Sequence, residues 1–406
     1  MKKGTVYYAL DISSNKIAAI KAVVNKSGDI IDILCHVGKS AGIKNGVINE
    51  LGLLSHAIAE VLERLSALSG GKAKSLYVSM QCPHIKAQHS VCAIPLSERS
   101  NKIITSSDIA KVNQQAYSLG LTIEEQLLHQ VPQEYTVDNH NRVLDPSGLY
   151  GHKLSADMLL ITAEGKDVQN LVSAVEQAGY KARAVVLSVL ATGLAVVPQE
   201  LRKKGCFLLD VGFDCSQMLV FKDGILRGYE LFDFGSHHIT EALAAELKLI
   251  YALAEDAKIS YGACLAANIS PDQEVLIKKE QSYRPIKRKA LCTIIEHKLR
   301  DFSHILKERL EVYQKASGEP LGMVVSGKAA LLEGFIENLE FNTGISTRLA
   351  KIEDAPISDL TYATAVGLAK YAASWHPPVR LFALSSYGTL FQKIVRKTKE
   401  IYHEYF

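Results

Sequence analysis

Two stretches of the chain repeat one pattern, in which an apolar strand ends at an aspartate and returns as a second apolar strand. Residues 7–10 lead into Asp11 and the return begins at Ile17, whereas residues 207–209 lead into Asp210 and the return covers 218–221. Such segments predict β-hairpins with a carboxylate at the bend. Copies about 200 residues apart predict two similar domains that face each other. Each domain would offer a carboxylate and exposed backbone N–H groups, a setting typical of nucleotide phosphates with Mg²⁺.

The composition excludes several classes of protein. A chain of 406 residues with 48% hydrophobic and 22% charged residues predicts a globular protein of two or more subdomains. The net charge of +3 argues against a nucleic-acid-binding protein. Seven cysteines without a CxxC pair predict reduced, mostly buried thiols in a cytosolic protein. No signal peptide is visible, and the longest apolar stretch, 184–197, is shorter than the ~20 residues that span a bilayer.

The apolar periodicity divides the rest of the chain. Helices are expected at 51–68, 106–119, 185–196 and 291–314, and alternation of strands with helices predicts sheets covered by helices. Residues 84–163 form a compact insertion, in which Pro132 places the strand 127–137 at a sheet edge. Residues 278–289 are interpreted as a polar, basic loop. His237 and His238 precede a helix, and their side chains are expected to point apart.

Several motifs narrow this organisation to one family. They are ALDISSNKIAAI (9–20), VPQEYTVD (131–138), DPSGLYG (145–151), AEDAKISYGA (254–263) and YATAVGLAKY (362–371). With the C-terminal tail, they give the chain a resemblance to the bacterial cell-division family FtsA, of the actin-like ATPase superfamily, over nearly its whole length. The resemblance implies an α/β actin-like fold of two facing lobes, with an FtsA-type inserted subdomain and a C-terminal amphipathic helix.

The resemblance also implies a division of the chain. The first lobe core comprises 1–83 and 164–204, and the inserted SHS2 subdomain comprises 84–163. The second lobe core comprises 205–238 and 311–375, with its small subdomain at 239–310. A tether at 376–389 leads to a membrane-targeting helix at 390–406.

At the nucleotide site, the family pattern survives only in part. The family has roughly DIGT, DIGGGT and TGGGA in its three phosphate loops; here they begin at Asp11, Asp210 and Ser326. Asp214 replaces a glycine and would face phosphate, which costs about 4 kcal/mol at ~4 Å and an effective dielectric of 20. The implied ATP- and Mg²⁺-binding residues, with Asp11 and Asp210 holding Mg²⁺ through water, are Asp11, Ser13, Ser14, Asn15, Lys16, Asp210, Gly212, Glu255, Lys258, Gly327, Lys328 and Ala329.

Two interpretations of this site stay open. In one, ATP still binds between the two carboxylates, and Lys328 partly compensates the charge of Asp214. In the other, the site has drifted and the fold persists without nucleotide. No residue is assigned a catalytic role, and efficient ATP turnover is not expected.

The last residues, LFQKIVRKTKEIYHEYF, predict an amphipathic helix with bulky apolar side chains on one face and cations beside it. A terminal helix of this kind suits an anionic membrane surface. The expected membrane-binding residues are Leu390, Phe391, Lys393, Ile394, Val395, Arg396, Lys397, Ile401, Tyr402, Tyr405 and Phe406.

The resemblance implies an adaptor that anchors filaments of the tubulin-like protein FtsZ to the cytoplasmic face of the cell membrane at the division septum. Its implied partners are the FtsZ C-terminal peptide, with Lys298 and Arg300 as candidate contacts, further copies of the chain, the anionic membrane and other division proteins. ATP would act as an assembly switch. The alternatives are a phosphotransferase of the same superfold, sugar-kinase-like or exopolyphosphatase-like, and an actin-like pilus-assembly protein.

Overall fold

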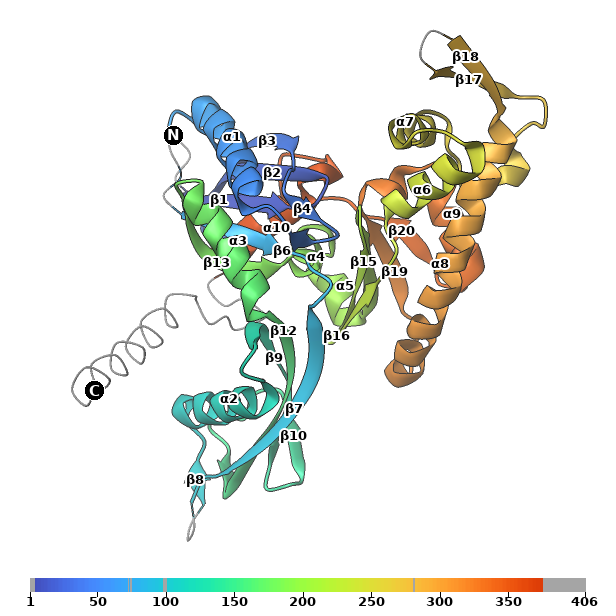
Figure 1. Cartoon of the computed structure of the whole chain (residues 1–406). Coiled ribbons are helices and arrows are strands. Elements are labelled where there is room, and N and C mark those ends of the chain that lie inside the picture. Colours follow the sequence, from blue (N-terminus) through green and yellow to red (C-terminus); the bar gives the residue numbers. More distant parts are fainter. Residues whose placement is uncertain (1–3, 72, 74, 98–100, 280–281, 375–406) are drawn as a thin grey trace, which may run out of the picture.

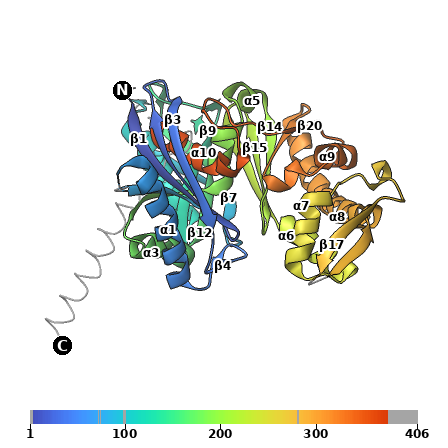
Figure 2. The ribbon, with the colours of Figure 1, turned by 90° about the horizontal axis from the view of Figure 1, so that it is seen from above.

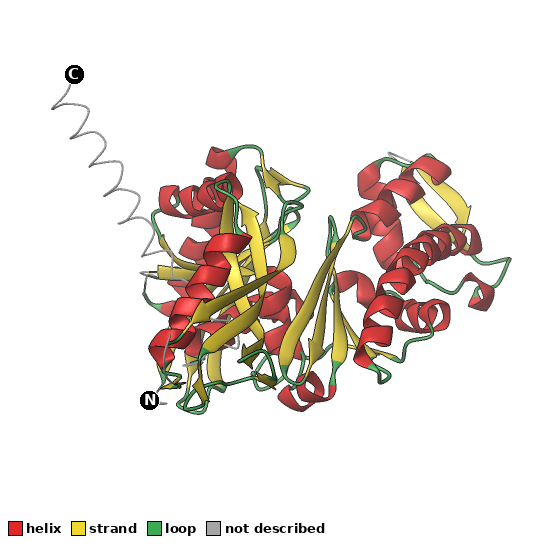
Figure 3. Cartoon of the chain, turned by 90° about the horizontal axis from the view of Figure 1, so that it is seen from below, coloured by secondary structure: helices red, strands yellow, loops and turns green. Residues whose placement is uncertain are grey.

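The computed structural model describes residues 4–71, 73, 75–97, 101–279 and 282–374. Two lobes stand side by side, each built on a five-stranded mixed sheet (Figures 1 and 3). A smaller subdomain extends from the first lobe (Figure 1). The predicted pair of similar lobes with an insertion is therefore observed. The C-terminal tether and helix lie outside the described residues.

The sheet of the first lobe has the strand order β13-β6-β1-β2-β3. Its strands are β1 (Thr5–Ile12), β2 (Lys16–Val24), β3 (Ile30–Lys39), β6 (Ser75–Met80) and β13 (Lys181–Leu187). The first hairpin is confirmed, since β1 and β2 pair antiparallel on either side of the turn after Asp11. Helix α1 (Leu51–Ser69) packs on one face beside α3 (Gly165–Gln177), and it ends at Gly70, whose φ is 68°. A short ribbon of β4 (Ile43–Lys44) and β5 (Val47–Ile48) completes the lobe.

The sheet of the second lobe has the order β16-β15-β14-β19-β20. Its strands are β14 (Cys206–Val211), β15 (Ser216–Lys222), β16 (Ile225–Phe232), β19 (Gly322–Ser326) and β20 (Thr347–Leu349). The second hairpin is likewise confirmed, with Asp210 one residue before the end of β14. The helices of this lobe are α5 (Gln199–Lys204), α6 (Ser236–Leu247), α7 (Tyr251–Tyr261), α8 (Arg288–Ser317) and α9 (Phe335–Thr343), with short 3-10 turns at Ala266–Asn268, Lys328–Leu331 and Leu360–Tyr362.

Helices α4 (Ser188–Val196) and α10 (Ala363–Ala373) lie between the two sheets (Figure 2). They cross closely, because a Cβ on Gly367 would lie 1.7 Å from the carbonyl oxygen of Ala191. Side chains of β14 alternate between two cores: Leu208 joins the core around α4 and α10, whereas Phe207 and Leu209 join the core under α6 and α8. One continuous core therefore links the lobes through the α4–α10 layer.

The inserted subdomain has a core of its own. Four strands in the order β10-β9-β12-β7 carry helix α2 (Ser106–Gly120) on one face, and β8 (Lys102–Ile103) pairs with β11 (Tyr150–Gly151). The four strands are β7 (Lys86–Pro95), β9 (Glu125–Val137), β10 (Asn141–Val143) and β12 (Lys153–Glu164).

A polar contact fastens this subdomain to the second lobe. Gln133, from the VPQEY motif, is buried and donates through Nε2 to the carbonyl oxygen of Leu226 at 2.9 Å. Arg227 Nη1 donates in return to the carbonyl oxygen of Gln133 at 3.2 Å. The insertion is therefore covalently continuous with the first lobe, and it contacts the second lobe through hydrogen bonds with β16.

Three expectations of local structure are corrected. Residues 278–289, expected as a basic loop, include the end of β17 (Glu274–Lys279), all of β18 (Ser282–Lys287) and the start of α8. The two strands form a hairpin because Val275, Ile277 and Ile286 bury their side chains in the second-lobe core. Residues 185–187 belong to β13, so α4 begins only at Ser188. Strand β9 is interior in its sheet, but Pro132 is tolerated because it faces a bulge and β10 pairs only with Tyr135–Val137.

Candidate functional site: the facing phosphate loops

Asp11 stands at the bend of the first hairpin and is buried. Its Oδ1 accepts a hydrogen bond from Ser79 Oγ at 2.8 Å, and Ser79 Oγ in turn accepts from the backbone N–H of Ile12 at 3.0 Å. Lys16 Nζ lies 3.7 Å from Asp11 Oδ2 and also donates to the carbonyl oxygen of Thr361. The carboxylate is therefore held by a neighbouring strand and a cation.

The rest of the first loop is closed by local hydrogen bonds. Ser13 N and Oγ both donate to the carbonyl oxygen of Lys16 at 3.0 Å, and Ser14 Oγ accepts from the backbone N–H of Gly46 at 3.2 Å. Asn15 is exposed at the tip. This loop holds its shape with serine hydroxyl groups.

Asp210 faces Asp11 from the other lobe. Burial and the charge of Asp11 raise the pKa of Asp210 to about 6, while Lys16 and hydrogen bonds with Ser326 and Thr192 act in the opposite direction. The structure therefore brings the two sequence-predicted carboxylates together, with cationic Lys16 between the two lobes.

The second phosphate loop, residues 212–215, is folded onto the start of α6. Gly212 N donates to the carbonyl oxygen of Cys215 at 3.1 Å, and the carbonyl oxygen of Phe213 accepts from both N and Nδ1 of His237. Phe213 also packs its ring on His237, with centroids 5.6 Å apart. Asp214 is half-buried within this loop.

The two histidines at the start of α6 do not point apart, contrary to expectation. The ring centroids of His237 and His238 are 3.8 Å apart. Both rings turn back over the helix N-terminus, His237 toward Phe213 and His238 toward the backbone N–H of Gly235, whose bond to His238 Nδ1 measures 3.0 Å. Each ring is therefore held by a backbone group beside the helix start, His237 by a carbonyl oxygen and His238 by an N–H group.

The lobes touch directly at this loop. Gln81, which follows β6 in the first lobe, donates through Nε2 to Cys215 Sγ at 2.8 Å. Burial raises the pKa of Cys215 to about 12, so this sulfur is a neutral thiol. The two facing loops are therefore joined by a hydrogen bond between two uncharged side chains.

The third loop requires its glycine. Gly327 has a φ of 96°, and a Cβ there would lie 2.1 Å from the carbonyl oxygen of Val211. The loop thus lies against the end of β14, next to Asp210, with which Ser326 pairs in the sheet. Ala329 is buried after it, and Lys328 is exposed.

Glu255 and Lys258 lie on one face of α7 as their spacing predicted, but they are engaged with α6. Lys258 Nζ, in a side chain only 4% exposed, lies 2.7 Å from Glu255 Oε2 and donates to Thr240 Oγ1 at 2.8 Å and to the carbonyl oxygen of Ser236 at 3.0 Å. Burial lowers the pKa of Lys258 and outweighs the effect of Glu255. The pair therefore fixes α7 onto the start of α6, where the second loop also rests.

Sequence reasoning missed four residues of this site: Ser79, Gln81, Thr192 and Asp359. Burial works against the ionisation of Asp359, but hydrogen bonds from Thr361 and the charges of Lys328 and Lys16 together lower its pKa. No local pattern marks these residues, since they come from the end of β6, from α4 and from the segment before the last 3-10 turn, and they meet only through the fold.

The geometry fits a divalent cation bound through water. The charge of Asp11 disfavours the ionised form of Asp210, and Lys16 offsets this only in part, as the raised pKa of Asp210 shows. A hydrated Mg²⁺ between them would favour both ionised forms. The residues present therefore fit an Mg²⁺–nucleotide complex held between the loops.

Of the remaining predicted residues, Lys298 and Arg300 lie on α8, away from these loops in sequence. Arg300 is exposed and lies 4.0 Å from Glu296, and Lys298 is half-buried. The predicted membrane-binding residues, 390–406, lie outside the described part of the chain. Among the residues that the structure describes, no helix is both long and apolar enough to cross a membrane.

Two families match the chain. "SHS2 domain inserted in FTSA" matches residues 83–162, and "Cell division protein FtsA" matches residues 207–367. The chain is 25% identical over 382 residues to the cell division protein FtsA of Escherichia coli K12, covering 90% of each chain. It is 26% identical over 402 residues to that of Borreliella burgdorferi, covering 96% of this chain and 95% of the relative.

Solved structures show the same fold. A PilM–PilN type IV pilus biogenesis complex matches with a TM-score of 0.63 at 15% identity, covering 90% of this chain and 98% of that one. MreB 5 of Spiroplasma citri bound to AMPPNP matches with a TM-score of 0.52 at 11% identity, covering 98% and 99%. The chain therefore has an actin-like α/β fold with an inserted SHS2 subdomain, and at least one protein of this fold binds nucleotide.

Proposed function

Since the chain belongs to the FtsA family of cell-division proteins, we propose that it anchors FtsZ filaments to the cytoplasmic face of the cell membrane at the division septum. The carrying observation is the match of both family descriptions, one to the insertion and one to the second lobe. The likeness to the pilus-assembly complex is one of fold alone. The altered phosphate loops speak against the phosphotransferase alternative.

The membrane contact is assigned to residues 390–406. The supporting observation is the sequence, in which apolar residues such as Phe391, Ile394 and Phe406 recur on one helical face beside Lys393 and Arg396. This segment would insert its apolar face among lipid headgroups and place its cations against anionic lipids.

Co-sedimentation with vesicles tests the anchor. FtsZ filaments are mixed with vesicles that contain anionic lipid and with the full chain, a chain that ends at Thr389, Ile394→Glu, or the control Glu400→Gln. We expect FtsZ to sediment with vesicles only with the full chain and Glu400→Gln. If the full chain leaves FtsZ in solution, or if the truncated chain delivers it equally well, the anchor proposal is wrong.

For the FtsZ contact, we propose that α8 of the second lobe receives the C-terminal peptide, with Arg300 and Lys298 as cationic contacts. Arg300 is exposed and only loosely paired with Glu296, so it is free to bind an acidic group. Titration of the labelled peptide should show at least tenfold weaker binding to Arg300→Glu. The control Lys307→Glu reverses an exposed charge two turns further along α8. Equal affinity of Arg300→Glu and the unaltered chain would remove α8 from the proposal.

We also propose that ATP with Mg²⁺ binds between the phosphate loops and favours self-assembly. Bound there, the ligand would supply the phosphate charge and cation that link the two lobes. Asp11 and Asp210 would hold the hydrated Mg²⁺, Lys16 and Lys328 would face phosphate, and the backbone at Gly212 and Gly327 would allow close approach. The supporting observations are the paired carboxylates and the nucleotide in a protein of the same fold.

A fluorescent ATP analogue, titrated with and without Mg²⁺, tests this part of the proposal. We expect Mg²⁺-dependent binding that Asp11→Asn and Asp210→Asn both weaken at least tenfold, while the control Asp29→Asn, on the distant turn between β2 and β3, has no effect. Absence of Mg²⁺-dependent binding would favour a fold that works without nucleotide.

A further inference from the structure

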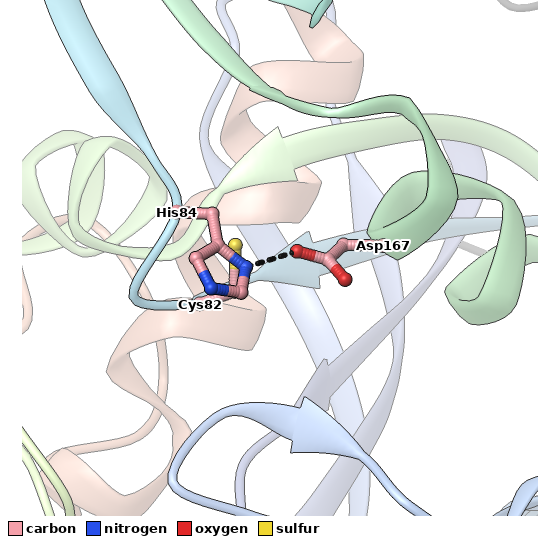
Figure 4. Close-up of side chains that lie close together, drawn as sticks. All are labelled: Cys82, His84 and Asp167. Carbon is pink, nitrogen blue, oxygen red and sulfur yellow. Dashed lines mark hydrogen bonds and ion pairs between the residues drawn. The ribbon is translucent and has the colours of Figure 1, made fainter. Parts of the chain in front are cut away.

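Three side chains of different chemistry meet where the inserted subdomain joins the first lobe. Cys82 and His84 lie in the tight turn between β6 and β7, and Asp167 lies in the first turn of α3, just after β12 returns (Figure 4). His84 Nδ1 is 2.7 Å from Asp167 Oδ2, and the thiol, imidazole and carboxylate ligand atoms all lie within 4.8 Å of one another. The cluster therefore bridges the outgoing and returning connections of the insertion.

The three groups are held in place by the backbone. The backbone N–H of His84 bonds to the sulfur of Cys82, which also interacts with the carboxylate of Asp167. The turn is fixed by Pro83 and by a bond from Ile85 N to the carbonyl oxygen of Cys82 at 3.4 Å. Asp167 is 11% exposed and borders a pocket that also touches Gln81 and Ser79. An ion could therefore reach the carboxylate from that pocket.

The donor set indicates which ion fits. A sulfur, an imidazole nitrogen and a carboxylate oxygen are the ligands that Zn²⁺ prefers, whereas Mg²⁺ and Ca²⁺ take oxygen alone. Tetrahedral bonds of about 2.0–2.3 Å place ligand atoms roughly 3.2–3.8 Å apart. To reach this spacing, the distance from His84 Nδ1 to Asp167 Oδ2 must lengthen from 2.7 Å, and any pair of ligand atoms near the 4.8 Å limit must move closer. Small side-chain rotations would make both changes.

We propose that Cys82, His84 and Asp167 bind Zn²⁺ as a clip across the neck of the inserted subdomain. On binding, the thiol of Cys82 releases its proton to solvent and its sulfur bonds to the metal. His84 binds through Nδ1 with its proton on Nε2, and Asp167 binds through one carboxylate oxygen. A fourth position remains for water, bordered by Glu164, whose Oε1 is 3.9 Å from His84 Nδ1.

The consequence for the fold is mechanical. The insertion contacts the second lobe through Gln133, and a metal at its neck would fix its other end to the first lobe.

Cobalt substitution tests the clip on the full, untagged chain, kept reduced and first stripped with a chelator. Co²⁺ should give a thiolate-to-cobalt charge-transfer band that saturates at one equivalent and disappears when Zn²⁺ is added. Cys82→Ser should abolish the band, and His84→Gln and Asp167→Asn should each weaken Zn²⁺ binding at least tenfold. Circular dichroism shows whether each variant folds. If Cys82→Ser does not fold, the loss of Zn²⁺ affinity in Asp167→Asn becomes the deciding measurement.

Two control variants separate this site from adventitious binding. Cys35→Ser removes a half-buried thiol on β3, and His89→Gln removes a histidine that pairs with a carboxylate, Asp157, at 3.0 Å. Both should retain the band. The proposal is overturned if the unaltered chain gives no band, if Cys82→Ser keeps it, or if either control loses it.

Hydrogen exchange provides a readout of the mechanical role. Zn²⁺ should slow amide exchange at least threefold in peptides covering residues 81–86 and 162–168 of the unaltered chain, and should leave exchange unchanged in Asp167→Asn. Equal protection of both chains by Zn²⁺ would show that the metal binds elsewhere.

Discussion

Replacing Asp210 with asparagine should stabilise the protein in the absence of nucleotide, and increasingly so as the pH rises. The carboxyl is half-buried and faces Asp11, and its pKa rises from 3.8 to about 6 on folding. A carboxyl with a raised pKa binds its proton more tightly in the folded state than in the unfolded state. Its ionisation therefore destabilises the fold as the pH rises through this window.

The magnitude follows from the shift. A difference of roughly two pKa units corresponds to about 3 kcal/mol once the group is fully ionised in both states. About half of this cost, ~1.5 kcal/mol, is already present at pH 5, because the unfolded carboxyl ionises first. Asparagine keeps the shape of the side chain and removes the charge. The free energy of unfolding of Asp210→Asn should therefore exceed that of the unaltered chain by about 1.5 kcal/mol at pH 5 and about 3 kcal/mol at high pH.

Urea denaturation followed by circular dichroism at pH 5 and pH 8 measures the difference. The control Asp214→Asn removes a half-buried charge from the same loop, and we expect it to change the free energy of unfolding by less than about 1 kcal/mol at either pH. Mg²⁺ with ATP should stabilise the unaltered chain and not Asp210→Asn. If the gap between the unaltered chain and Asp210→Asn is the same at both pH values, the inferred ionisation of Asp210 is wrong.

Three further substitutions test the packing around the loops. Gly327→Ala should lower the free energy of unfolding, measured with urea, by more than about 3 kcal/mol, because Gly327 has a φ of 96° and lies against the end of β14. The control Gly344→Ala, at a φ of 72° in open space, should lower it by about 1 kcal/mol. Equal losses would contradict the close approach at Gly327. Gln133→Ala should speed amide exchange in β16, and the control Glu134→Gln should not; unchanged exchange would show that the insertion does not depend on this contact. Lys258→Met should lower the unfolding free energy by about 2 kcal/mol because it leaves a carboxylate partly buried without its cation, and an unchanged value would refute that role.

The sequence indicated the features that depend on near neighbours. Both hairpins were predicted because apolar strands, an aspartate and turn residues follow one another directly. Helices α1 and most of α8 were predicted because their apolar residues recur at helical spacing, and Gly70 marked the end of α1. The facing of Asp11 and Asp210 was predicted as well, from the repetition of one local pattern in two lobes.

Local patterns failed where long-range packing chose between alternatives. Residues 278–289 were expected as loop because lysines and arginines dominate them, yet pairing of β18 with β17 and burial of Ile286 in the second-lobe core select a hairpin. The spacing placed Lys258 on one face of α7 with Glu255, but it did not indicate the partners from α6, Thr240 and the carbonyl oxygen of Ser236.

The sequence by itself thus determined the two-lobed fold, its insertion and the two acidic turns, because patterns of residues adjacent along the chain indicate each of them. Only the tertiary structure decided that Gln81 meets Cys215, that Gln133 fastens the insertion to β16, and that Asp167 meets Cys82 across the neck. The residues of each such pair are separated by 85 to 134 positions in the sequence. Local spacing and periodicity cannot predict such contacts, because the two residues of each pair meet only after the strands and helices between them have folded.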